Sequence, residues 1–337
     1  MPHAIRFTHP GGPDMLRLQD VEGVEPGPEE VRITVHAAGI NNADLLERRG
    51  HYPVPPGAPP GLGLECAGVI DAVGRDVTTW NVGDRVCALL TGGGYAEQVV
   101  THAGQVMPIP RGLSMVEAAA LPEVACTVYS NLGVIVGLEA EQAVLIHGGA
   151  GGIGSFAVQW AAAIGARVIA TAGSEVKMDA ARTLGADVAI NYRTQDFVRV
   201  TLAETDGWGV DAILDIIGAP YLARNVECLA PDGHLVTIGG AASSTPFDLW
   251  ALMSRRATVS ATLLRARPVE QKAQIVAGVV REVFPLIEAG LIRAVVDRVF
   301  PLENAAAAHD YLERGGTIGK VVLKTNAAFA GDGRAKR

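Results

Sequence analysis

A glycine-rich turn between an apolar segment and a helix-forming segment is the feature that most constrains this chain. Residues 144–147 read Val-Leu-Ile-His, and a helical pattern runs to Ala166 after the turn. Glycines at 149, 151 and 154 have the G-x-G-x-x-G spacing, which permits a tight turn, close approach of backbone to a pyrophosphate, and close packing of helix on strand. The start of the helix offers free N–H groups to phosphates. The turn therefore predicts a dinucleotide site formed by Gly149, Ala150, Gly151, Gly152, Ile153 and Gly154.

The segments around this turn alternate between strand and helix patterns from about residue 123 onward. Apolar strand-like segments follow at 167–172, 188–192, 210–217, 234–239 and 258–263, with helical segments near 175–184 and 221–229. Six strands with connecting helices predict a doubly wound parallel sheet and an α/β fold. The glycine turn follows the first strand and opens the first helix, which is the context that dinucleotide binding requires.

The rest of the chain predicts a second domain. Residues 1–122 contain alternating apolar segments separated by glycine turns, which indicates a β-rich domain. Five prolines between His51 and Gly63 predict an irregular loop, because proline removes a backbone donor. We predict domains at 1–122 and 123–265, a return to the first domain at 266–325 with the order helix, strand, helix, strand, and a frayed tail at 326–337.

The composition indicates which binding partners and which cellular location to expect. The net charge of −8 argues against nucleic acid or an anionic membrane as a partner. No secretory leader precedes the first strand-like segment, so we expect a cytoplasmic protein. The span 143–166 lacks charged residues and has the length of a membrane helix, but its six glycines indicate a buried core instead.

The cysteines do not predict a metal site or a disulfide framework. The four cysteines stand at positions 66, 87, 126 and 228 without a C-x-x-C pair, and we interpret them as small buried apolar residues. No H-E-x-x-H or G-x-S-x-G motif occurs, which argues against zinc peptidases and serine hydrolases.

The tip of the second strand of the parallel sheet favours NADPH over NADH. An acidic residue about 20 residues after the glycines would hold the ribose 2′-hydroxyl of NAD, and no acid stands at this strand tip. Ser174 can donate to a 2′-phosphate and Lys177 can supply a positive charge. Simpler roles remain open, since Ser174 can also cap the following helix and Lys177 can lie on a solvated face. Gly173 and Tyr192 complete the predicted adenosine end of the site.

Several stretches outside the glycine turn resemble a known family. They are Ile40–Leu45, Gly50–Pro53, Gly61–Glu65, Gly83–Val86, Ala118–Glu123, Leu263–Arg267 and Ile318–Val322. Together they resemble the zinc-free quinone oxidoreductase branch of the medium-chain dehydrogenase/reductase superfamily, and in particular its p53-inducible, NADPH-dependent subgroup. The resemblance implies a GroES-like β-rich catalytic domain beside a Rossmann domain.

The departures from zinc-dependent members of that superfamily imply that no metal is bound. By this resemblance Asn41 stands where those enzymes have a cysteine ligand, and Leu64 replaces the histidine of a Gly-His-Glu motif. Leucine cannot bind zinc. The substrate oxygen must then be polarised by hydrogen bonds, for which Tyr52 is the predicted donor and Asn41 the residue that orients substrate or ribose. Tyr52 can alternatively pack the loop, and Asn41 can form a turn.

The resemblance also adds residues on the cofactor side. It places Thr127 near the nicotinamide, backbone contacts at the ends of the fifth and sixth strands, and a closing segment near the C-terminus. The residues concerned are Thr127, Gly239, Gly240, Leu263, Leu264, Gly319 and Lys320.

These observations predict an NADPH:quinone oxidoreductase acting on a small planar quinone without a metal. A reductase of enoyl groups or other α,β-unsaturated carbonyls is an alternative in the same class, and a non-catalytic NADPH-binding protein is an alternative from another class. The apolar segment 256–263 would be an exposed sheet edge if it stayed unpaired, so we expect a homodimer that covers it.

Overall fold

The computed structural model describes residues 1–240 and 244–326, and the chain divides into two compact units. Unit 1 contains Met1–Cys126, Arg265–Glu288 and Ala294–Arg337, and unit 2 contains Thr127–Leu264 and Ala289–Arg293. Most of the predicted tail at 326–337 lies outside the described residues.

Unit 2 is the predicted doubly wound parallel sheet. Its strand order is β10-β9-β8-β11-β12-β13 and every pairing is parallel. The strands are β8 (Ala143–Ile146), β9 (Arg167–Ala172), β10 (Val188–Asn191), β11 (Val210–Asp215), β12 (Leu229–Thr237) and β13 (Thr258–Ala261). The order reverses between β8 and β11, which is where doubly wound sheets bind ligands at the carboxyl ends of their strands.

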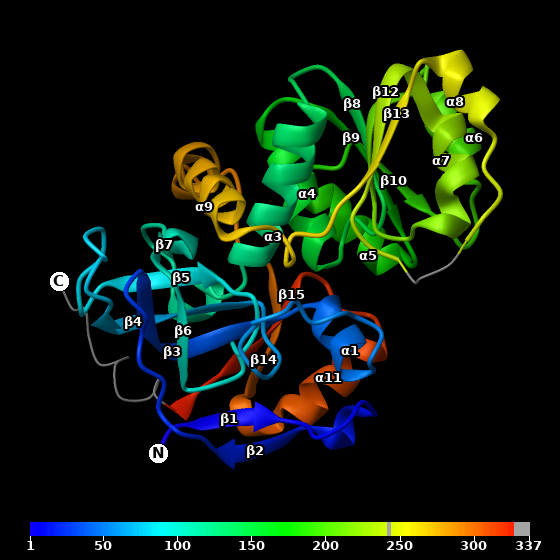
Figure 1. Cartoon of the computed structure of the whole chain (residues 1–337). Coiled ribbons are helices and arrows are strands. Elements are labelled where there is room, and N and C mark those ends of the chain that lie inside the picture. The colour runs from blue at the N-terminus through cyan, green and yellow to red at the C-terminus, as the bar shows by residue number, and fades with distance from the viewer. Residues whose placement is uncertain (241–243, 327–337) are drawn as a thin grey trace. The chain divides into compact units, whose positions relative to one another are not determined.

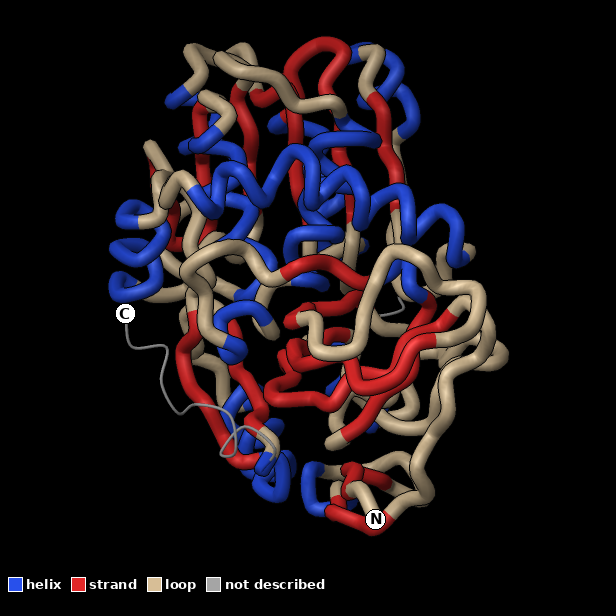
Figure 2. Tube along the Cα trace, turned by 90° about the vertical axis from the view of Figure 1, so that its left-hand side faces the viewer, coloured by secondary structure: helices blue, strands red, loops and turns tan. Residues whose placement is uncertain are grey.

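Helices cover both faces of this sheet, with α4 on one side and α6 and α7 on the other (Figure 1). On the face of α6 and α7, Leu145, Ile169, Ile213 and Leu235 lie in an apolar core. Because helices cover both faces of the sheet, its strands lack polar alternation. The helices are α4 (Gly152–Ala163), α5 (Glu175–Thr183), α6 (Phe197–Glu204), α7 (Leu222–Cys228) and α8 (Leu249–Arg255), with a π-helical segment at Tyr129–Val136. Figure 2 shows the same layering, with helices against the strands.

Unit 1 is built on a seven-stranded sheet that is antiparallel except at one pairing. The order is β14-β15-β3-β4-β5-β7, β6 also pairs with β3, and β14 runs parallel to β15. The strands are β3 (Glu30–Ile40), β4 (Glu65–Val73), β5 (Arg85–Leu89), β6 (Gln98–His102), β7 (Val106–Pro108), β14 (Val296–Pro301) and β15 (Lys320–Lys324); β1 (His3–Arg6) and β2 (Arg17–Asp20) form a separate ladder.

Short helices connect and cover the strands of unit 1. They are α1 (Asn42–Arg48), α2 (Met115–Ala118), α9 (Val269–Gly278), α10 (Phe284–Glu288) and α11 (Ala305–Glu313), while α3 (Pro122–Val128) runs from unit 1 into unit 2. The loop predicted from its prolines, residues 51–63, contains no helix or strand. The predicted C-terminal order of helix, strand, helix, strand is present as α9 to β15.

Two strand boundaries differ from the prediction. β12 begins at Leu229 rather than near His234, because Leu229 already pairs with Val210 of β11 before the Pro-Asp-Gly turn at 231–233, where the register shifts and Asp232 has a φ of 65°. β13 ends at Ala261 rather than Leu263; Thr262 N still donates to the carbonyl of Thr237 at 3.0 Å, while the Oγ1 of Thr262 donates to Asn131 Oδ1 at 2.7 Å.

Candidate active site

The glycine turn of unit 2 joins β8 to α4 with very little space around its backbone. A Cβ added at Gly154 would lie 2.1 Å from the carbonyl oxygen of Gly148, whereas one added at Gly151 would meet its nearest atom at 3.4 Å. Gly154 is therefore needed for packing, while the surface at Gly151 is open enough for a ligand to approach. The first N–H groups of α4 have no partner within a helix, so the turn fits a pyrophosphate.

Three buried polar side chains, His147, Thr171 and Asn225, form a hydrogen-bonded group that supports this turn. The sequence pattern did not identify them. Gly148 N donates to Thr171 Oγ1 at 3.2 Å, and His147 Nδ1 lies 3.1 Å from the same oxygen. His147 Nε2 lies 2.8 Å from Asn225 Oδ1, and burial lowers the pKa of His147 to about 4. The ring is thus neutral, with Nε2–H donating to Asn225. The signal that could have identified this group is His147, a polar residue at the end of the apolar segment 144–146.

The predicted adenosine end lies at the tips of β9 and β10. Ser174 is the N-cap of α5, and its Oγ accepts from Lys177 N at 3.4 Å, so its capping role is present. Tyr192 is 42% exposed, and its hydroxyl would lie 2.7 Å from a Cβ at Gly173. These residues therefore gather at one corner of the sheet, and their contacts to a 2′-phosphate stay predictions.

The other predicted cofactor residues lie at strand ends or in helices. Thr127 is 7% exposed in α3, and its carbonyl accepts from Asn131 Nδ2 at 2.8 Å. Gly239 and Gly240 follow β12, and Leu263 and Leu264 follow β13. Gly319 and Lys320 belong to unit 1, where Lys320 begins β15. Their cofactor contacts also stay predictions.

In unit 1, strand pairing brings three distant polar residues together. β3 pairs antiparallel with both β15 and β4, so the end of β3 lies beside the starts of the other two strands. Asn41 follows β3, Glu65 begins β4 and Lys320 begins β15. Lys320 Nζ lies 2.7 Å from Glu65 Oε1, and Asn41 Nδ2 donates to the same oxygen at 2.9 Å. Lys320 also donates to Asn41 Oδ1 and to the carbonyl of Ile40.

A second group of charges lies in the same unit. Arg265 donates through Nε to the carbonyl of Thr91 at 2.8 Å and through Nη1 to Glu47. Lys272 is 2% exposed and donates to Thr91 Oγ1 at 2.7 Å; burial lowers its pKa. Glu123 joins the two groups, because its N–H donates to Glu65 Oε2 at 3.0 Å and its charge interacts with that of Arg265. We call the full set the polar cluster: Asn41, Glu47, Glu65, Glu123, Arg265, Lys272 and Lys320.

Tyr52 lies in the proline loop beside this cluster. The Arg265 guanidinium carbon lies 5.8 Å from the centroid of its ring. Burial, and then the charge of Glu123, raise the pKa of Tyr52 to about 12. Its hydroxyl therefore keeps its proton at neutral pH and can donate a hydrogen bond. Both ends of the Asn41 amide are occupied within the cluster, so a direct substrate contact by Asn41 stays a prediction.

Asp44 anchors the helix that follows Asn41. It is fully buried and accepts from Asn41 N at 2.8 Å, Gly63 N at 3.0 Å and the Tyr95 hydroxyl at 3.0 Å. Burial raises its pKa to about 6, although these hydrogen bonds oppose the shift. Tyr95 in turn contacts His309, whose pKa is lowered to about 3 by burial and by nearby arginine charge. These connected hydrogen bonds of Asp44, Tyr95 and His309 hold α1 in place and hence fix the position of Asn41.

The sequence analysis did not identify Glu65, Glu123, Arg265 or Lys272 as functional residues. Three of the four stand in or beside apolar stretches, such as Gly61–Glu65, Ala118–Glu123 and Leu263–Arg265. A charged residue inside an apolar stretch must be buried with a partner or serve a function. That signal could have identified the first three.

The polar cluster does not have the donor set of a zinc site. Within residues 1–240 and 244–326, no group of three or more His, Cys, Asp or Glu side chains could hold a metal ion. The leucine at 64 is 1% exposed, and the Lys320 ammonium lies where a cation would balance Glu65.

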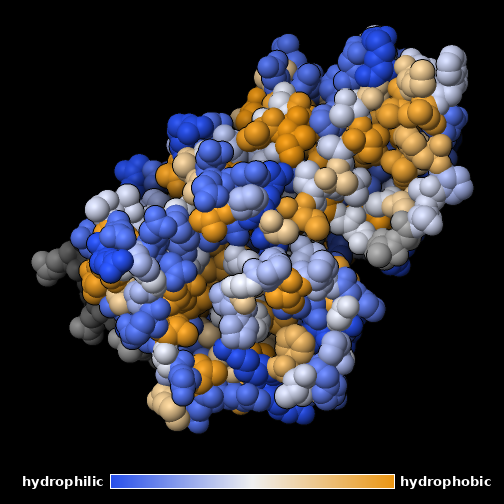
Figure 3. Space-filling model, viewed as in Figure 1, coloured by the Kyte–Doolittle hydropathy of each residue, from blue (hydrophilic) through white to orange (hydrophobic). Residues whose placement is uncertain are grey.

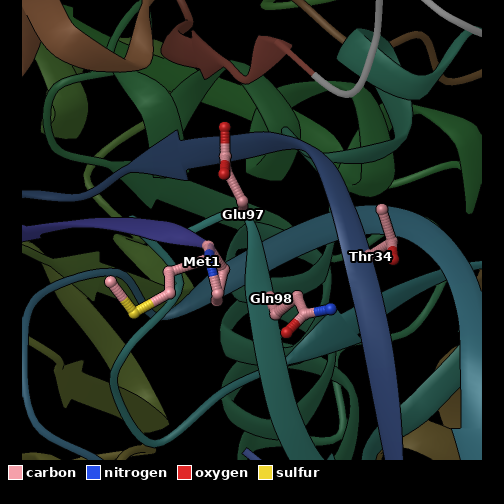
Figure 4. Close-up of a pocket in the computed structure, with 5 residues that line it drawn as sticks. Met1, Thr34, Glu97 and Gln98 are labelled. Atoms are coloured by element: carbon pink, nitrogen blue, oxygen red, sulfur yellow. The ribbon is translucent and has the colours of Figure 1, made fainter. Parts of the chain in front are cut away.

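Two other features of the molecule lack the character of a functional site. A shallow hollow is lined by Met1, Pro2, Thr34, Glu97 and Gln98 (Figure 4). Its acid, Glu97, already pairs with His3 at 3.0 Å. One helical stretch, Met115–Val136, is long and apolar enough to cross a membrane, yet its most apolar 18-residue window is 72% buried inside the protein. It is better explained as a core segment.

Comparison with known proteins agrees with this architecture. Residues 27–111 match the alcohol dehydrogenase GroES-like domain, and residues 184–323 match the zinc-binding dehydrogenase family. The chain is 36% identical over 325 residues to a quinone oxidoreductase of Pseudomonas aeruginosa, covering 96% of this chain and 99% of the relative. It is 35% identical to a 2-haloacrylate reductase of Burkholderia, covering 94% and 97% of the two chains.

A solved structure gives the same result. The quinone oxidoreductase of Escherichia coli complexed with NADPH superposes with a TM-score of 0.84 at 31% identity, covering 96% of this chain and 99% of the other. The predicted fold and family are therefore confirmed. The chain belongs to the medium-chain dehydrogenase/reductase superfamily, with a GroES-like domain and a Rossmann domain, and it has the oxidoreductase character of that superfamily.

Proposed function

We propose that this protein is an NADPH-dependent, metal-free reductase whose acceptor is a small planar quinone. The observation that carries the proposal is the likeness to quinone oxidoreductases along nearly the whole chain. The polar cluster supports the metal-free part, because a lysine ammonium balances Glu65 and leucine occupies position 64. We further propose a cytoplasmic location.

The residues of this chain would bind and orient the reactants. The glycine turn and the Ser174 corner would hold the cofactor, which supplies a hydride when bound. The Tyr52 hydroxyl would donate to the substrate oxygen as negative charge develops there, which stabilises the transition state. A quinone needs little further help, since its reduced ring is aromatic.

A second acceptor class has a specific observation in its favour. The 2-haloacrylate reductase relative is nearly as similar as the quinone oxidoreductase, and the substrate in its name contains a conjugated carbon–carbon double bond. An enoyl or other α,β-unsaturated carbonyl reductase is therefore the alternative.

A screen of NADPH oxidation tests the proposal. Benzoquinones, naphthoquinones and enones are compared with and without a chelator, and we expect turnover of quinones that the chelator does not change. Loss of activity with chelator would contradict metal-free catalysis. Tight NADPH binding without oxidation by any acceptor would instead support the non-catalytic alternative.

Replacing Lys177 tests the assignment of NADPH. Within the described ranges the Lys177 side chain has no ion pair, so its ammonium is available to a 2′-phosphate. Lys177→Ala should raise the dissociation constant of NADPH about tenfold, which corresponds to about 1.4 kcal/mol, and leave that of NADH unchanged. Arg182→Ala is the matched control, because Arg182 lies on the same helix and pairs with Asp179 at 2.8 Å. Equal effects of both variants on NADPH would contradict the assignment.

We propose a homodimer formed through the free edge of β13. This strand ends the sheet, and Leu249, Trp250 and Met253 of α8 are 58%, 72% and 58% exposed. Figure 3 shows apolar side chains gathered over this part of unit 2. Trp250→Asp should shift the protein from dimer to monomer in light scattering at micromolar concentration. A wild-type monomer, or a dimer that the variant leaves intact, would contradict this interface.

A further inference from the structure

Among the described residues, Glu123 is the one acid of the polar cluster whose carboxyl has no hydrogen-bond or ion-pair partner. Glu65 accepts from Asn41, Lys320 and Glu123 N, and Glu47 pairs with Arg265. The Glu123 side chain is nevertheless half-buried. The neighbouring cations donate to other acceptors, so this carboxyl is free to act on a ligand.

Charged and titratable groups from six parts of unit 1 act on Glu123. They are Asp44 of α1, Tyr52 of the proline loop, Glu65 of β4, Arg265, Lys272 of α9 and Lys320 of β15. Cys126 lies on the same helix and is buried. Burial, and then the charge of Glu65, raise the pKa of Glu123 to about 8. At neutral pH the carboxyl thus holds a proton, which it can release without a strong base.

A second observation in the same cluster points to a ligand oxygen, at Arg265, whose charge acts on Glu123. Arg265 is 3% exposed, and its Nη2 is buried without a hydrogen-bond partner among the described residues. Leaving a buried donor unsatisfied is unfavourable, and most of all when the donor is charged. A carbonyl oxygen of a substrate would satisfy it.

We propose that Glu123 is a catalytic proton donor and that it serves acceptors of the α,β-unsaturated carbonyl class. This inference rests on the proposed reductase function. Hydride addition forms a C–H bond at the β-carbon, and the π electron pair moves toward the carbonyl to give an enolate. The α-carbon then takes the Glu123 proton, the carbonyl re-forms and Glu123 becomes a carboxylate that water reprotonates. A bound cofactor would supply the hydride with its two electrons and Glu123 the proton, so the step balances.

Quinones and enones should respond differently to loss of this proton. The reduced quinone is an aromatic phenolate that water can protonate quickly at oxygen. An enolate must be protonated at carbon, where a positioned acid contributes about 10²–10⁴-fold. Glu123 therefore matters for one acceptor class more than for the other.

The test compares Glu123→Gln with wild type on both acceptor classes, using full-length protein. Glu123→Gln should lower kcat for an enone about 100-fold or more and kcat for a quinone less than about tenfold. Glu22→Gln is the matched control, because Glu22 is an exposed acid of the same unit, and it should change neither rate. Equal losses on both acceptors would indicate a structural role and overturn the proposal, as would unchanged enone reduction.

Two further readouts separate proton donation from positioning. In wild type, kcat for the enone should fall above about pH 8, where Glu123 loses its proton, and this limb should be absent from the residual activity of Glu123→Gln. Infrared difference spectra of the cofactor-free protein should show a protonated carboxyl band that titrates over the same range and disappears in the variant. A wild-type spectrum without this band would overturn the proposal.

Failure of the proposed function looks different. If wild type oxidises NADPH with neither acceptor class, the reductase proposal fails, whereas turnover that Glu123→Gln leaves intact contradicts only the role of Glu123. Tyr52→Phe should slow both classes together, because the Tyr52 hydroxyl donates to oxygen in either reaction.

Discussion

Gly154→Ala should abolish NADPH binding and destabilise unit 2, whereas Gly151→Ala should weaken binding while leaving the fold intact. The Cβ that the first substitution adds at Gly154 would lie 2.1 Å from the oxygen and 2.7 Å from the carbon of the Gly148 carbonyl, and 2.8 Å from Gly149 Cα. All three are backbone atoms of the turn itself. Because they cannot rotate away, the turn must open.

The expected sizes follow from this geometry. Overpacking of this kind costs about 1–3 kcal/mol of unfolding free energy, and displaced phosphate donors should raise the dissociation constant of NADPH more than about 100-fold. In Gly151→Ala the nearest atom lies 3.4 Å away, and Gly151 has an ordinary φ of −74° as the N-cap of α4. The protein should lose about 1 kcal/mol or less, chiefly from the poorer cap.

Fluorescence titration with NADPH and urea unfolding distinguish the two variants. We expect the larger loss of stability in Gly154→Ala and a loss of NADPH affinity in both variants. This outcome requires that Gly154 acts through packing and Gly151 through closeness to the pyrophosphate. Normal NADPH affinity in Gly154→Ala, or equal stability losses in both variants, would contradict these roles.

The sequence predicts this turn because the signal is local. Three glycines, one strand and one helix lie within about 20 consecutive residues, and their spacing alone states what the backbone must do. The six-stranded parallel sheet followed from the alternation of strand and helix patterns around the turn. The β12 boundary was missed because a Pro-Asp-Gly turn normally ends a strand, whereas here Leu229 already pairs with Val210 before the turn, and the ladders with β11 and β13 run from His234 onward.

The polar cluster is different, because its partners are far apart along the chain. Asn41 and Lys320 are 279 positions apart, and they meet only because β15 pairs with the last residues of β3. Glu123 reaches Glu65 through a backbone N–H, which no side-chain pattern encodes. Sequence reasoning found Asn41 by resemblance and placed Lys320 near the cofactor. It had no means of finding that the two side chains bond each other.

Breaking the ion pair at the centre of this cluster should have a strongly asymmetric effect. Lys320→Met removes the ammonium and leaves the fully buried Glu65 carboxylate with only Asn41 Nδ2 and Glu123 N as donors among the described residues. An uncompensated buried charge costs about 3–5 kcal/mol. Glu65→Gln should cost less, because Lys320 keeps the carbonyl of Ile40 at 2.8 Å and the oxygen of Asn41 as acceptors.

The double variant Lys320→Met, Glu65→Gln completes the cycle. It removes both charges, so it should be more stable than Lys320→Met alone, by roughly 1–3 kcal/mol. Urea unfolding gives the overall values, and hydrogen exchange of β3, β4 and β15 locates the loss in unit 1. Additive single effects would mean that the two charges do not act on each other. The single effects can instead be non-additive as expected while the double variant still oxidises NADPH with quinones. The pair then organises the cluster without taking part in hydride transfer, and Glu123 and Tyr52 remain the groups that act on the substrate.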